Sequence, residues 1–530
     1  MSVLFRNATV IDGSGERPFP ADVYVRGDTI IKVGQSENLS EPDAQTVDCT
    51  GRILCPGFMD MHAHSDLEIV RNPTMPFKVR QGITFDLSGN CGIGAFPWRE
   101  GDEPRFADIL GHYGKWDWTD FETYSEKLRT GINCGFLQSH SCLRINAIKG
   151  NPNRAATAEE IEKMCSLLET SLEQGCFGFS TGLYYAPCMY ADKKERLALL
   201  SVVKKHNRIF AVHHRCEGDD ILSSIDEILS YVRETGVRLE ISHLKAIGRK
   251  NQVKVPEVLE KIHQMREEGF DVAFDQYPYE YGSTSLFSLL PPDLLRLAPE
   301  ELSAILRKTE SDKELYDSIV REMMDPHGWD SIAELCPWED ISIVTMESSP
   351  EFNGMNMVQI AEKLSMDPFN ALFHILAKEK GYALMSDITQ SAQSLRMIFE
   401  DPLMCFGTDA LYTGPFAHPR SANGAIHLLY ERCVKENYSF ESVIRKMTST
   451  VASRLGLKDR GLIREGYKAD LVLFDPATLK DNSDMAHPFE MCTGLETVMV
   501  NGTFALKDGR LTNSLSGMLI KARDYQFRNL

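Results

Sequence analysis

The sequence contains no run of about 18 consecutive apolar residues, the length that a membrane-spanning helix requires. Its first residues, MSVLFRNATVIDG, lack the basic segment and the long apolar stretch of a secretory signal. Its 13 cysteines are an odd number and include no Cys-x-x-Cys pair, which argues against a disulfide framework and against a zinc ribbon. These absences predict a cytoplasmic protein with no membrane partner.

Positive charge is also scarce in this chain. It has 57 Lys and Arg against 76 Asp and Glu, which gives a formal net charge of −19. Such a charge repels phosphate backbones, so we expect no nucleic-acid partner. Hydrophobic residues make up 43% of the 530 residues, and this ordinary value excludes a disordered or fibrous protein.

Both ends of the chain have the alternating apolar and polar pattern of short strands. Residues 3–50 contain VLFRNATVIDG and ADVYVRGDTIIKVG, with turns at Asp12-Gly13 and Gly27-Asp28. Near the other end, LVLFDP precedes a predicted hairpin with Asn501-Gly502 as its turn. We therefore predict a small β-sandwich domain built from residues 1–56 plus 460–530.

The middle of the chain, residues 57–459, alternates apolar strands with amphipathic helices. Repeated strand–helix units predict a parallel sheet, and eight candidate strands predict an α/β fold of the (β/α)₈ TIM barrel type. The segment at about 286–380 is too long for one connection, so we expect an inserted lid subdomain there. The candidate strands are GFMDMHA, ITFDLSG, CGFLQSH, CFGFST, IFAVHH, LEISH, VAFDQYP and MCFGTD. The clearest helical stretches are 157–174, 193–207, 219–235 and 254–268.

Metal-binding residue types stand at the ends of several candidate strands. The carboxyl ends of barrel strands converge on one face, where barrel enzymes place their chemistry. Histidines, a cysteine and a carboxylate that meet there would form a transition-metal site, and this set of ligand types favours zinc. The residues are His62, His64, Cys91, His213 or His214, His243 and Asp409.

Each of these residues also has an ordinary structural interpretation. Cys91 could be a buried structural thiol, and an isolated His-x-His pair often binds nothing. Adjacent residues in a strand point to opposite faces, so only one of His213 and His214 should reach the site. Asp409 could cap the following helix, although a carboxylate beside a metal site is better explained as a general base.

Several motifs resemble those of a known family. Residues 56–66, PGFMDMHAHSD, look like the first-strand motif of the amidohydrolase superfamily. The elements GNCG, STGL, ISHLK, YPY and HPR are similar to those of the D-aminoacylase (N-acyl-D-amino-acid deacylase) family, as is the tail at 461–476. The similarity covers nearly the whole chain, and GNCG at 89–92 is its most specific part.

The resemblance implies roles for individual residues. Cys91, His213 and His243 would hold one tightly bound Zn²⁺, while His62, His64 and Asp409 would form a second, weaker metal position. Asp409 would also be the catalytic proton shuttle. Tyr185 would lie near the scissile carbonyl. The residues expected to bind the substrate carboxylate are Lys245, Tyr277 and Arg420, and a guanidinium and an ammonium suit that task.

The implied activity is zinc-dependent hydrolysis of the amide bond of N-acyl-D-amino acids by a monomer or small homo-oligomer. The alternative is a cyclic amidohydrolase of dihydroorotase or hydantoinase type. Those relatives use a carboxylated lysine on the fourth strand, whereas 178–182 here reads GFSTG. A barrel that has lost its activity is a third interpretation, but such a chain should lack several ligands. The sequence departs from the family pattern at His214, Cys216 and Cys188, so we expect the shape of the pocket to differ from that of its relatives.

Overall fold

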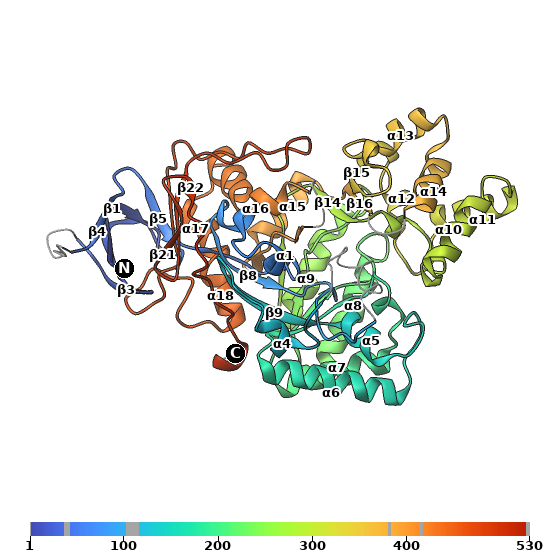
Figure 1. Cartoon of the computed structure of the whole chain (residues 1–530), viewed down its shortest axis with the longest axis horizontal. Coiled ribbons are helices and arrows are strands. Elements are labelled where there is room, and N and C mark those ends of the chain that lie inside the picture. The colour runs from blue at the N-terminus through green and yellow to red at the C-terminus, as the bar shows by residue number, and fades with distance from the viewer. Residues whose placement is uncertain (1, 36–42, 102–115, 380–382, 413–416, 526–530) are drawn as a thin grey trace.

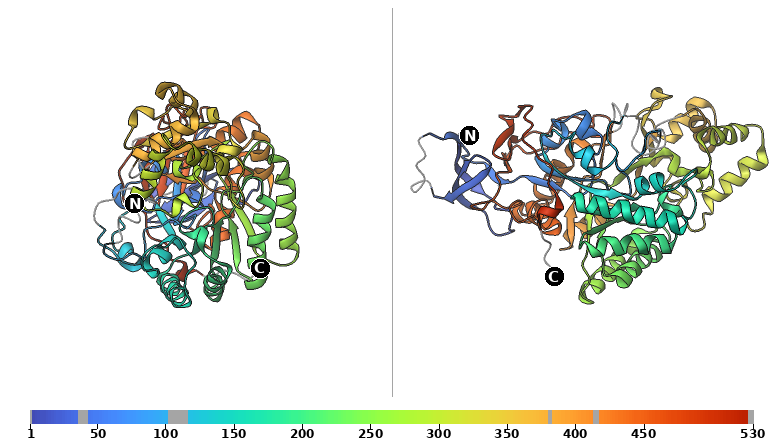
Figure 2. Two further views of the ribbon diagram at one scale, coloured as in Figure 1. Left: turned by 90° about the vertical axis from the view of Figure 1, so that its right-hand side faces the viewer. Right: turned by 60° about the horizontal axis from the view of Figure 1, so that its bottom comes forward.

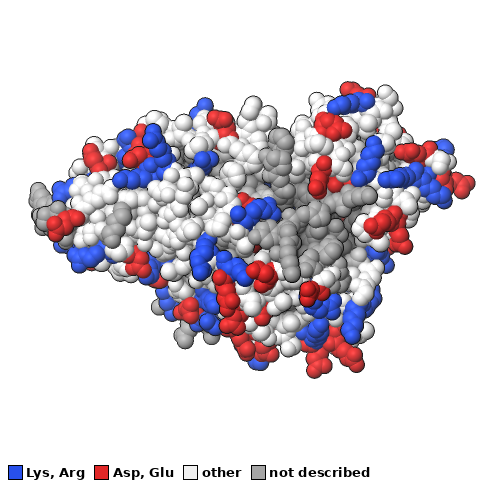
Figure 3. Space-filling view, in the orientation of Figure 1, with Lys and Arg blue, Asp and Glu red and all other residues white. Residues whose placement is uncertain are grey.

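The structure is a computed structural model that describes residues 2–35, 43–101, 116–379, 383–412 and 417–525. Its parts follow one another along the long axis of the molecule (Figures 1 and 2). A sheet built from both chain ends lies at one end, a barrel lies in the middle, and an inserted segment lies at the far end. Acidic and basic side chains are interspersed over the face shown in Figure 3.

The middle part is a barrel of parallel strands, as the sequence predicts. Within the described residues, eight strands pair in the order β17-β13-β12-β11-β10-β9-β8-β6. The Met61 N–H donates to the Phe406 carbonyl at 3.0 Å, and β7 (Ala63–His64) pairs in parallel with β18 (Ala410–Leu411), so the first and last strands meet. The barrel strands are β6 (Phe58–Asp60), β8 (Ile83–Ser88), β9 (Asn133–Ser139), β10 (Gly178–Gly182), β11 (Ile209–His213), β12 (Arg238–Ile241), β13 (Val272–Gln276) and β17 (Met404–Phe406).

Amphipathic helices cover the outside of the barrel, and α6 (Ala158–Gln174) shows why they form. Thr157 caps its first turn in a capping box with Glu160, and Gly175 ends it with a φ of +127°. Buried Ile161, Met164, Leu168 and Leu172 follow the helical period and face the barrel. The other long connecting helices are α7 (Lys193–Lys205), α8 (Ile221–Thr235), α9 (Val255–Glu267), α15 (Ala392–Glu400) and α16 (Arg420–Leu429).

Both ends of the chain contribute to one sheet, as predicted. Its order is β22-β21-β20-β19-β5-β1-β2-β3, with β4 paired to β1, and the two ends of the chain meet where β5 and β19 pair antiparallel. Gly502 (φ +73°) completes the turn between β20 and β21, where a Cβ would lie 1.7 Å from the Gly27 oxygen. The strands are β1 (Ser2–Val10), β2 (Phe19–Arg26), β3 (Thr29–Gly34), β4 (Gln45–Asp48), β5 (Ile53–Pro56), β19 (Leu471–Phe474), β20 (Leu495–Val500), β21 (Thr503–Lys507) and β22 (Arg510–Leu511).

The insertion between β13 and β17 has a small antiparallel sheet and a hydrophobic core of its own. Its first strand pairs with its last, so the inserted sheet runs from Tyr281 to Ile388 and extends past 286–380 on both sides. Its strands are β14 (Tyr281–Ser285), β15 (Ile341–Met346) and β16 (Ala383–Ile388). Its helices include α10 (Pro299–Lys308), α11 (Lys313–Met324), α12 (Ile332–Leu335), α13 (Met357–Leu364) and α14 (Pro368–Lys378).

None of the helices in the described ranges combines the length and the apolar character that crossing a membrane would need.

Candidate metal centre and active site

Side chains from four barrel strands meet at the carboxyl end of the barrel. His62 follows β6, Cys91 lies in the loop after β8, His213 ends β11, and His243 follows β12. The Cys91 Sγ lies 3.3 Å from the His62 Nε2 and 3.3 Å from the His243 Nε2. The His213 Nδ1 lies 2.9 Å from the same His243 Nε2. All four side chains are buried, so one sulfur and three imidazoles form a compact cluster.

His64 and Asp409 extend this cluster on one side. The Asp409 Oδ1 lies 3.1 Å from the His64 Nε2 and 3.5 Å from the His62 Nε2. Three overlapping triplets have their donor atoms within 4.8 Å of one another. The structure therefore brings together all six residues that the sequence analysis named as metal ligands. The triplets are His62–His64–Cys91, Cys91–His213–His243 and His62–His243–Asp409.

The donor geometry fits a zinc ion. Zinc binds thiolate and imidazole at about 2.0–2.3 Å with tetrahedral angles, which places neighbouring donor atoms roughly 3.3–3.7 Å apart. The two 3.3 Å separations from the Cys91 Sγ fall in this range, and the 2.9 Å between His213 and His243 is slightly shorter. A thiolate with imidazoles is also a ligand set that zinc prefers over magnesium or calcium.

The backbone is strained at three residues of the cluster. Cys91, His243 and Asp409 have φ values of 53°, 35° and 51°, in the left-handed region that side chains other than glycine rarely adopt. Such strain persists only where the surrounding structure enforces it, and it is concentrated at functional sites. Three strained residues with donor atoms within a few ångströms of one another therefore support a functional role for the cluster.

Charges within the cluster favour ionised ligands. Burial alone would raise the pKa of the Cys91 thiol, but the nearby His62 and His243 outweigh it and hold that pKa well below its usual range. Burial would likewise raise the pKa of Asp409, but Arg420 and His64 keep it well below its ordinary value. A thiolate and a carboxylate are thus available as anionic donors.

Buried carboxylates hold the ligands in place. The Asp275 Oδ1 accepts from the His243 N–H at 2.8 Å and lies 3.0 Å from the His62 Nδ1, which orients that ring with its Nε2 toward the cluster. Beneath the first strand, the buried Lys78 Nζ lies 2.5 Å from Asp60 and 2.8 Å from Asp86. These contacts fix the strand ends from which the ligands project.

Two other histidines near the strand ends do not join the cluster. His214 faces away from it, and its Nδ1 lies 2.9 Å from the Ser224 Oγ, so only one of the adjacent pair enters the site, as predicted. His140 does not line the pocket either. Its ring is fully buried, with the Nδ1 2.8 Å from the Thr181 Oγ1 and the Nε2 2.8 Å from Glu195.

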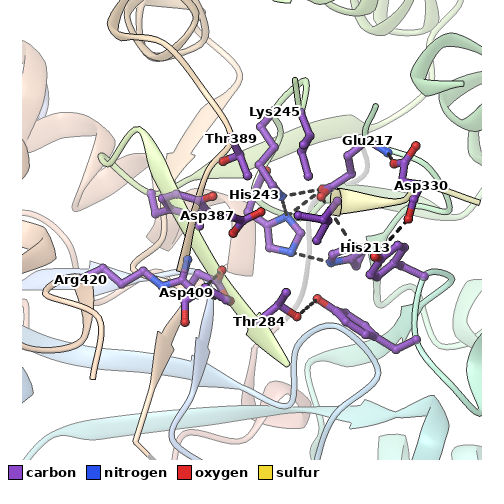
Figure 4. A pocket seen from close by; sticks show the side chains of 17 residues that line it. His213, Glu217, His243, Lys245, Thr284, Asp330, Asp387, Thr389, Asp409 and Arg420 are labelled. Carbon is purple, nitrogen blue, oxygen red and sulfur yellow. Dashed lines mark hydrogen bonds and ion pairs between the residues drawn. The ribbon is translucent and has the colours of Figure 1, made fainter. Parts of the chain in front are cut away.

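A pocket opens beside the cluster (Figure 4). It is lined by the four residues that the sequence analysis assigned to substrate binding, together with His213, His243 and Asp409. The Arg420 guanidinium lies 4.7 Å from the centre of the Tyr277 ring, and the Lys245 Nζ lies 5.9 Å from it. The four residues are Tyr185, Lys245, Tyr277 and Arg420.

The cations of this pocket have protein partners but retain donors. The Arg420 Nη2 lies 2.8 Å from the Asp409 Oδ2, and the Lys245 Nζ lies 2.7 Å from the Glu217 Oε1. Among the described residues, the Arg420 Nε and Nη1 and the Tyr277 hydroxyl are buried without a hydrogen-bond partner. Buried donors without partners destabilise the protein unless a ligand accepts their hydrogen bonds, so the arrangement suits an anionic group of a substrate.

Sequence reasoning missed several polar residues of the site. Glu217 lies 3.3 Å from the His243 Nδ1 as well as beside Lys245, and Asp275 supports two ligands. A buried carboxylate in the apolar strand VAFDQ was the available signal for Asp275. Glu217 follows His213 by four residues in a loop and gave no comparable signal. The insertion adds Thr284, Asp330, Asp387 and Thr389 to the pocket wall.

Comparison with known proteins identifies the family. A family model described as the amidohydrolase family matches residues 360–505. A D-aminoacylase of Alcaligenes xylosoxydans xylosoxydans is 30% identical over 524 residues, which are 98% of this chain and 97% of the relative. The chain belongs to the D-aminoacylase family.

Two further members of the D-aminoacylase family are similar over nearly their whole length. The N-acyl-D-aspartate deacylase of the same organism is 31% identical, over 94% of this chain and 91% of its own. The structure of the N-acyl-D-glutamate deacylase from Bordetella bronchiseptica, complexed with zinc and a phosphonate inhibitor, has a TM-score of 0.81 and 28% identity. It covers 98% of this chain and 99% of its own. The expectation that this chain is an amidohydrolase of the D-aminoacylase family is therefore confirmed.

Proposed function

We propose that this protein hydrolyses the amide bond of N-acyl-D-amino acids in a zinc-dependent reaction, releasing a carboxylate and a free D-amino acid. The observation that carries the proposal is the thiolate–imidazole cluster, which lies directly beside a pocket with unsatisfied guanidinium and hydroxyl donors. The relatives named for D-aminoacylase and D-aspartate deacylase activity support the substrate class.

Cys91, His213 and His243 are the residues we assign to the tightly held zinc ion. His62, His64 and Asp409 form the adjoining position, which we assign to a second and weaker metal. A zinc ion at these donors would supply the positive charge that polarises an amide carbonyl and makes a water molecule more acidic.

Asp409 is the residue we assign to proton transfer. Its Oδ1 faces His62 and His64, and its Oδ2 is held by Arg420, so the carboxylate is oriented at the junction of cluster and pocket. From there it accepts the proton of the attacking water and returns it to the nitrogen of the departing amine. Amines leave poorly unless they are protonated, so this transfer matters for an amide substrate.

Arg420, Lys245 and Tyr277 are the residues we assign to the substrate α-carboxylate. Arg420 and Tyr277 are neighbours in the pocket wall, and a carboxylate accepts from the unsatisfied donors of both. Fixing the carboxylate fixes which face of the α-carbon turns toward the metal cluster, and this is the physical basis for handedness. Tyr185, whose hydroxyl lies 3.0 Å from the Thr284 Oγ1, lines the pocket beside His213.

The ring-opening alternative has less support. A bridged pair of metals of the dihydroorotase or hydantoinase type needs a lysine on the fourth strand, and β10 (Gly178–Gly182) supplies none. In place of such a side chain, Gly182 allows the strand to approach the Cys91 carbonyl, where a Cβ would lie at 2.3 Å. Cys91 is instead the available anionic ligand.

A substrate panel tests the proposal. The zinc-loaded protein is incubated with N-acetyl-D-amino acids, their L-enantiomers, dihydroorotate and hydantoin, and amine release or ring opening is measured. We expect turnover of linear D-substrates alone, loss of activity on chelation and recovery with zinc. Turnover of the rings, or equal rates for D- and L-substrates, would reject it.

A further inference from the structure

The pocket wall contains more carboxyl side chains than lysine and arginine side chains. Among its described residues, Glu217, Asp330, Asp387 and Asp409 are carboxylates, whereas Lys245 and Arg420 are the lysine and arginine. A substrate carboxylate bound by the two cations would add a further negative charge. The wall therefore has to be complementary to something other than a second anionic group.

Three of the four carboxylates already have partners. Asp409 pairs with Arg420 and belongs to the metal cluster, and Glu217 pairs with Lys245. The Asp330 Oδ2 accepts hydrogen bonds from the backbone N–H groups of Glu217 and Gly218, the latter at 2.8 Å. These three carboxyl groups thus already have partners within the protein.

Asp387 is different. It lies on β16 of the insertion and is 2% exposed, and its carboxylate has no side-chain hydrogen bond or ion pair with another described residue. In Figure 4 it points inward, toward the space in front of His243. Burying a carboxylate without a partner is unfavourable in free energy, so this position favours a ligand group that is cationic or donates strong hydrogen bonds.

We propose that Asp387 selects N-acyl-D-amino acids that carry a cationic side chain, such as those of D-lysine, D-ornithine and D-arginine. This inference rests on the proposed function and names its substrate class. With the α-carboxylate on Arg420 and Tyr277, an ammonium or guanidinium group in the same pocket pairs with Asp387. Tyr184, Ile247 and Ile332 also line the pocket and offer apolar surface for the methylene stem of such a side chain.

The same charges disfavour acidic side chains. A second substrate carboxylate would lie in the same wall as the unpaired Asp387, while Arg420 is engaged by the α-carboxylate and Lys245 by Glu217. Like charges placed together in a buried site cost several kilocalories per mole. The preference is therefore opposite to that of the relatives named for D-aspartate and D-glutamate.

The test compares matched substrates on the zinc-loaded protein. N-acetyl-D-lysine, N-acetyl-D-norleucine and N-acetyl-D-glutamate differ mainly in the charge of the side chain. We expect kcat/KM for D-lysine to exceed that for D-norleucine by about tenfold or more, since a desolvated ion pair has this order of effect. D-glutamate should be the poorest of the three. Acetylating the lysine side chain as well should remove the advantage.

The variant Asp387→Asn tests whether Asp387 causes the preference for cationic side chains. It should lower kcat/KM for D-lysine by about 10- to 100-fold and change that for D-norleucine by less than about threefold. Asp317→Asn is the matched control, because it removes a half-exposed carboxylate from α11 of the same insertion. It should leave both values unchanged.

The outcomes separate the two proposals. If D-norleucine is turned over as well as D-lysine, or if Asp387→Asn lowers both equally, the side-chain inference is wrong and the deacylase function stands. If no N-acetyl-D-amino acid is hydrolysed, the proposed function fails and the inference falls with it.

Discussion

The two walls of the pocket are built in different ways. The barrel wall consists of residues at strand ends, and buried contacts such as Asp275 with His62 and His243 hold them in position. The opposite wall comes from an insertion with its own small sheet and its own core, which contributes Thr284, Asp330, Asp387 and Thr389. The rigid strand ends suit chemistry that requires fixed geometry, while the insertion can vary without disturbing them.

This difference leads to a general expectation for mutagenesis. A change in the barrel wall should lower turnover of every substrate, because all of them use the same reacting groups. A change in the insertion wall should alter ratios between substrates. Substitutions in each wall test this division.

The largest effect is expected for Cys91→Ala. The variant loses the thiolate that lies between His62 and His243, so both bound zinc and activity should fall to background. Zinc per chain is measured by elemental analysis, and activity with an N-acetyl-D-amino acid.

Cys405→Ala provides the control for Cys91→Ala. Cys405 is equally buried in barrel strand β17 but lies in an apolar cluster, so this variant should keep its zinc and most of its activity. Similar losses of metal in the two variants would show that Cys91 has no special role.

Asp409→Asn should have the next largest effect. The amide keeps the shape of the side chain but cannot accept a proton, and general acid–base groups typically contribute ~10²- to 10⁴-fold to kcat. We expect a loss in kcat of this order for all substrates, with zinc content nearly unchanged because Cys91, His213 and His243 remain. A kcat within a few-fold of the wild-type value would mean that another group moves the proton.

The barrel wall was also the part that the sequence predicted best. Cys91, His213 and His243 each follow or end a short apolar strand, so their convergence could be inferred from the barrel alone. The left-handed backbone at Cys91 and Asp409 could not, because it depends on how the loops pack after the strands have formed.

The insertion wall could not be derived from local patterns. Asp387 reaches the pocket because β16 pairs with β14, which lies about a hundred residues earlier in the chain. The ion pairs of Lys245 with Glu217 and of Arg420 with Asp409 likewise join segments whose relative positions depend on the tertiary fold. The family resemblance named Arg420 and Lys245, but it did not indicate that both would already have carboxylate partners.

Arg420→Met tests the junction of the two walls. Losing a buried, charge-assisted contact costs roughly 2–5 kcal/mol, so KM should rise steeply for an N-acyl-D-amino acid. The rise in KM should nearly vanish for a substrate whose α-carboxylate is replaced by a carboxamide, which has no charge to bind. Because Arg420 also holds the Asp409 Oδ2, kcat should fall as well, but less than in Asp409→Asn. An unchanged KM would leave the carboxylate to Lys245 and Tyr277.

The smallest effect is expected for Asp330→Asn and concerns stability. Burial raises the pKa of Asp330 from 3.8 to about 7, so the folded protein holds a proton that the unfolded chain releases earlier. Stability from this group is present at low pH and is lost as the pH rises from about 4 to 7. The variant has no such titration, so its Tm relative to wild type should rise by a few degrees across that window and then level off.

Calorimetry of the zinc-loaded proteins measures this difference. The control is Asp317→Asn, which changes a half-exposed carboxylate of the same insertion and should show no comparable trend. A difference independent of pH would mean that Asp330 is ionised throughout, with the backbone N–H groups of Glu217 and Gly218 compensating its burial.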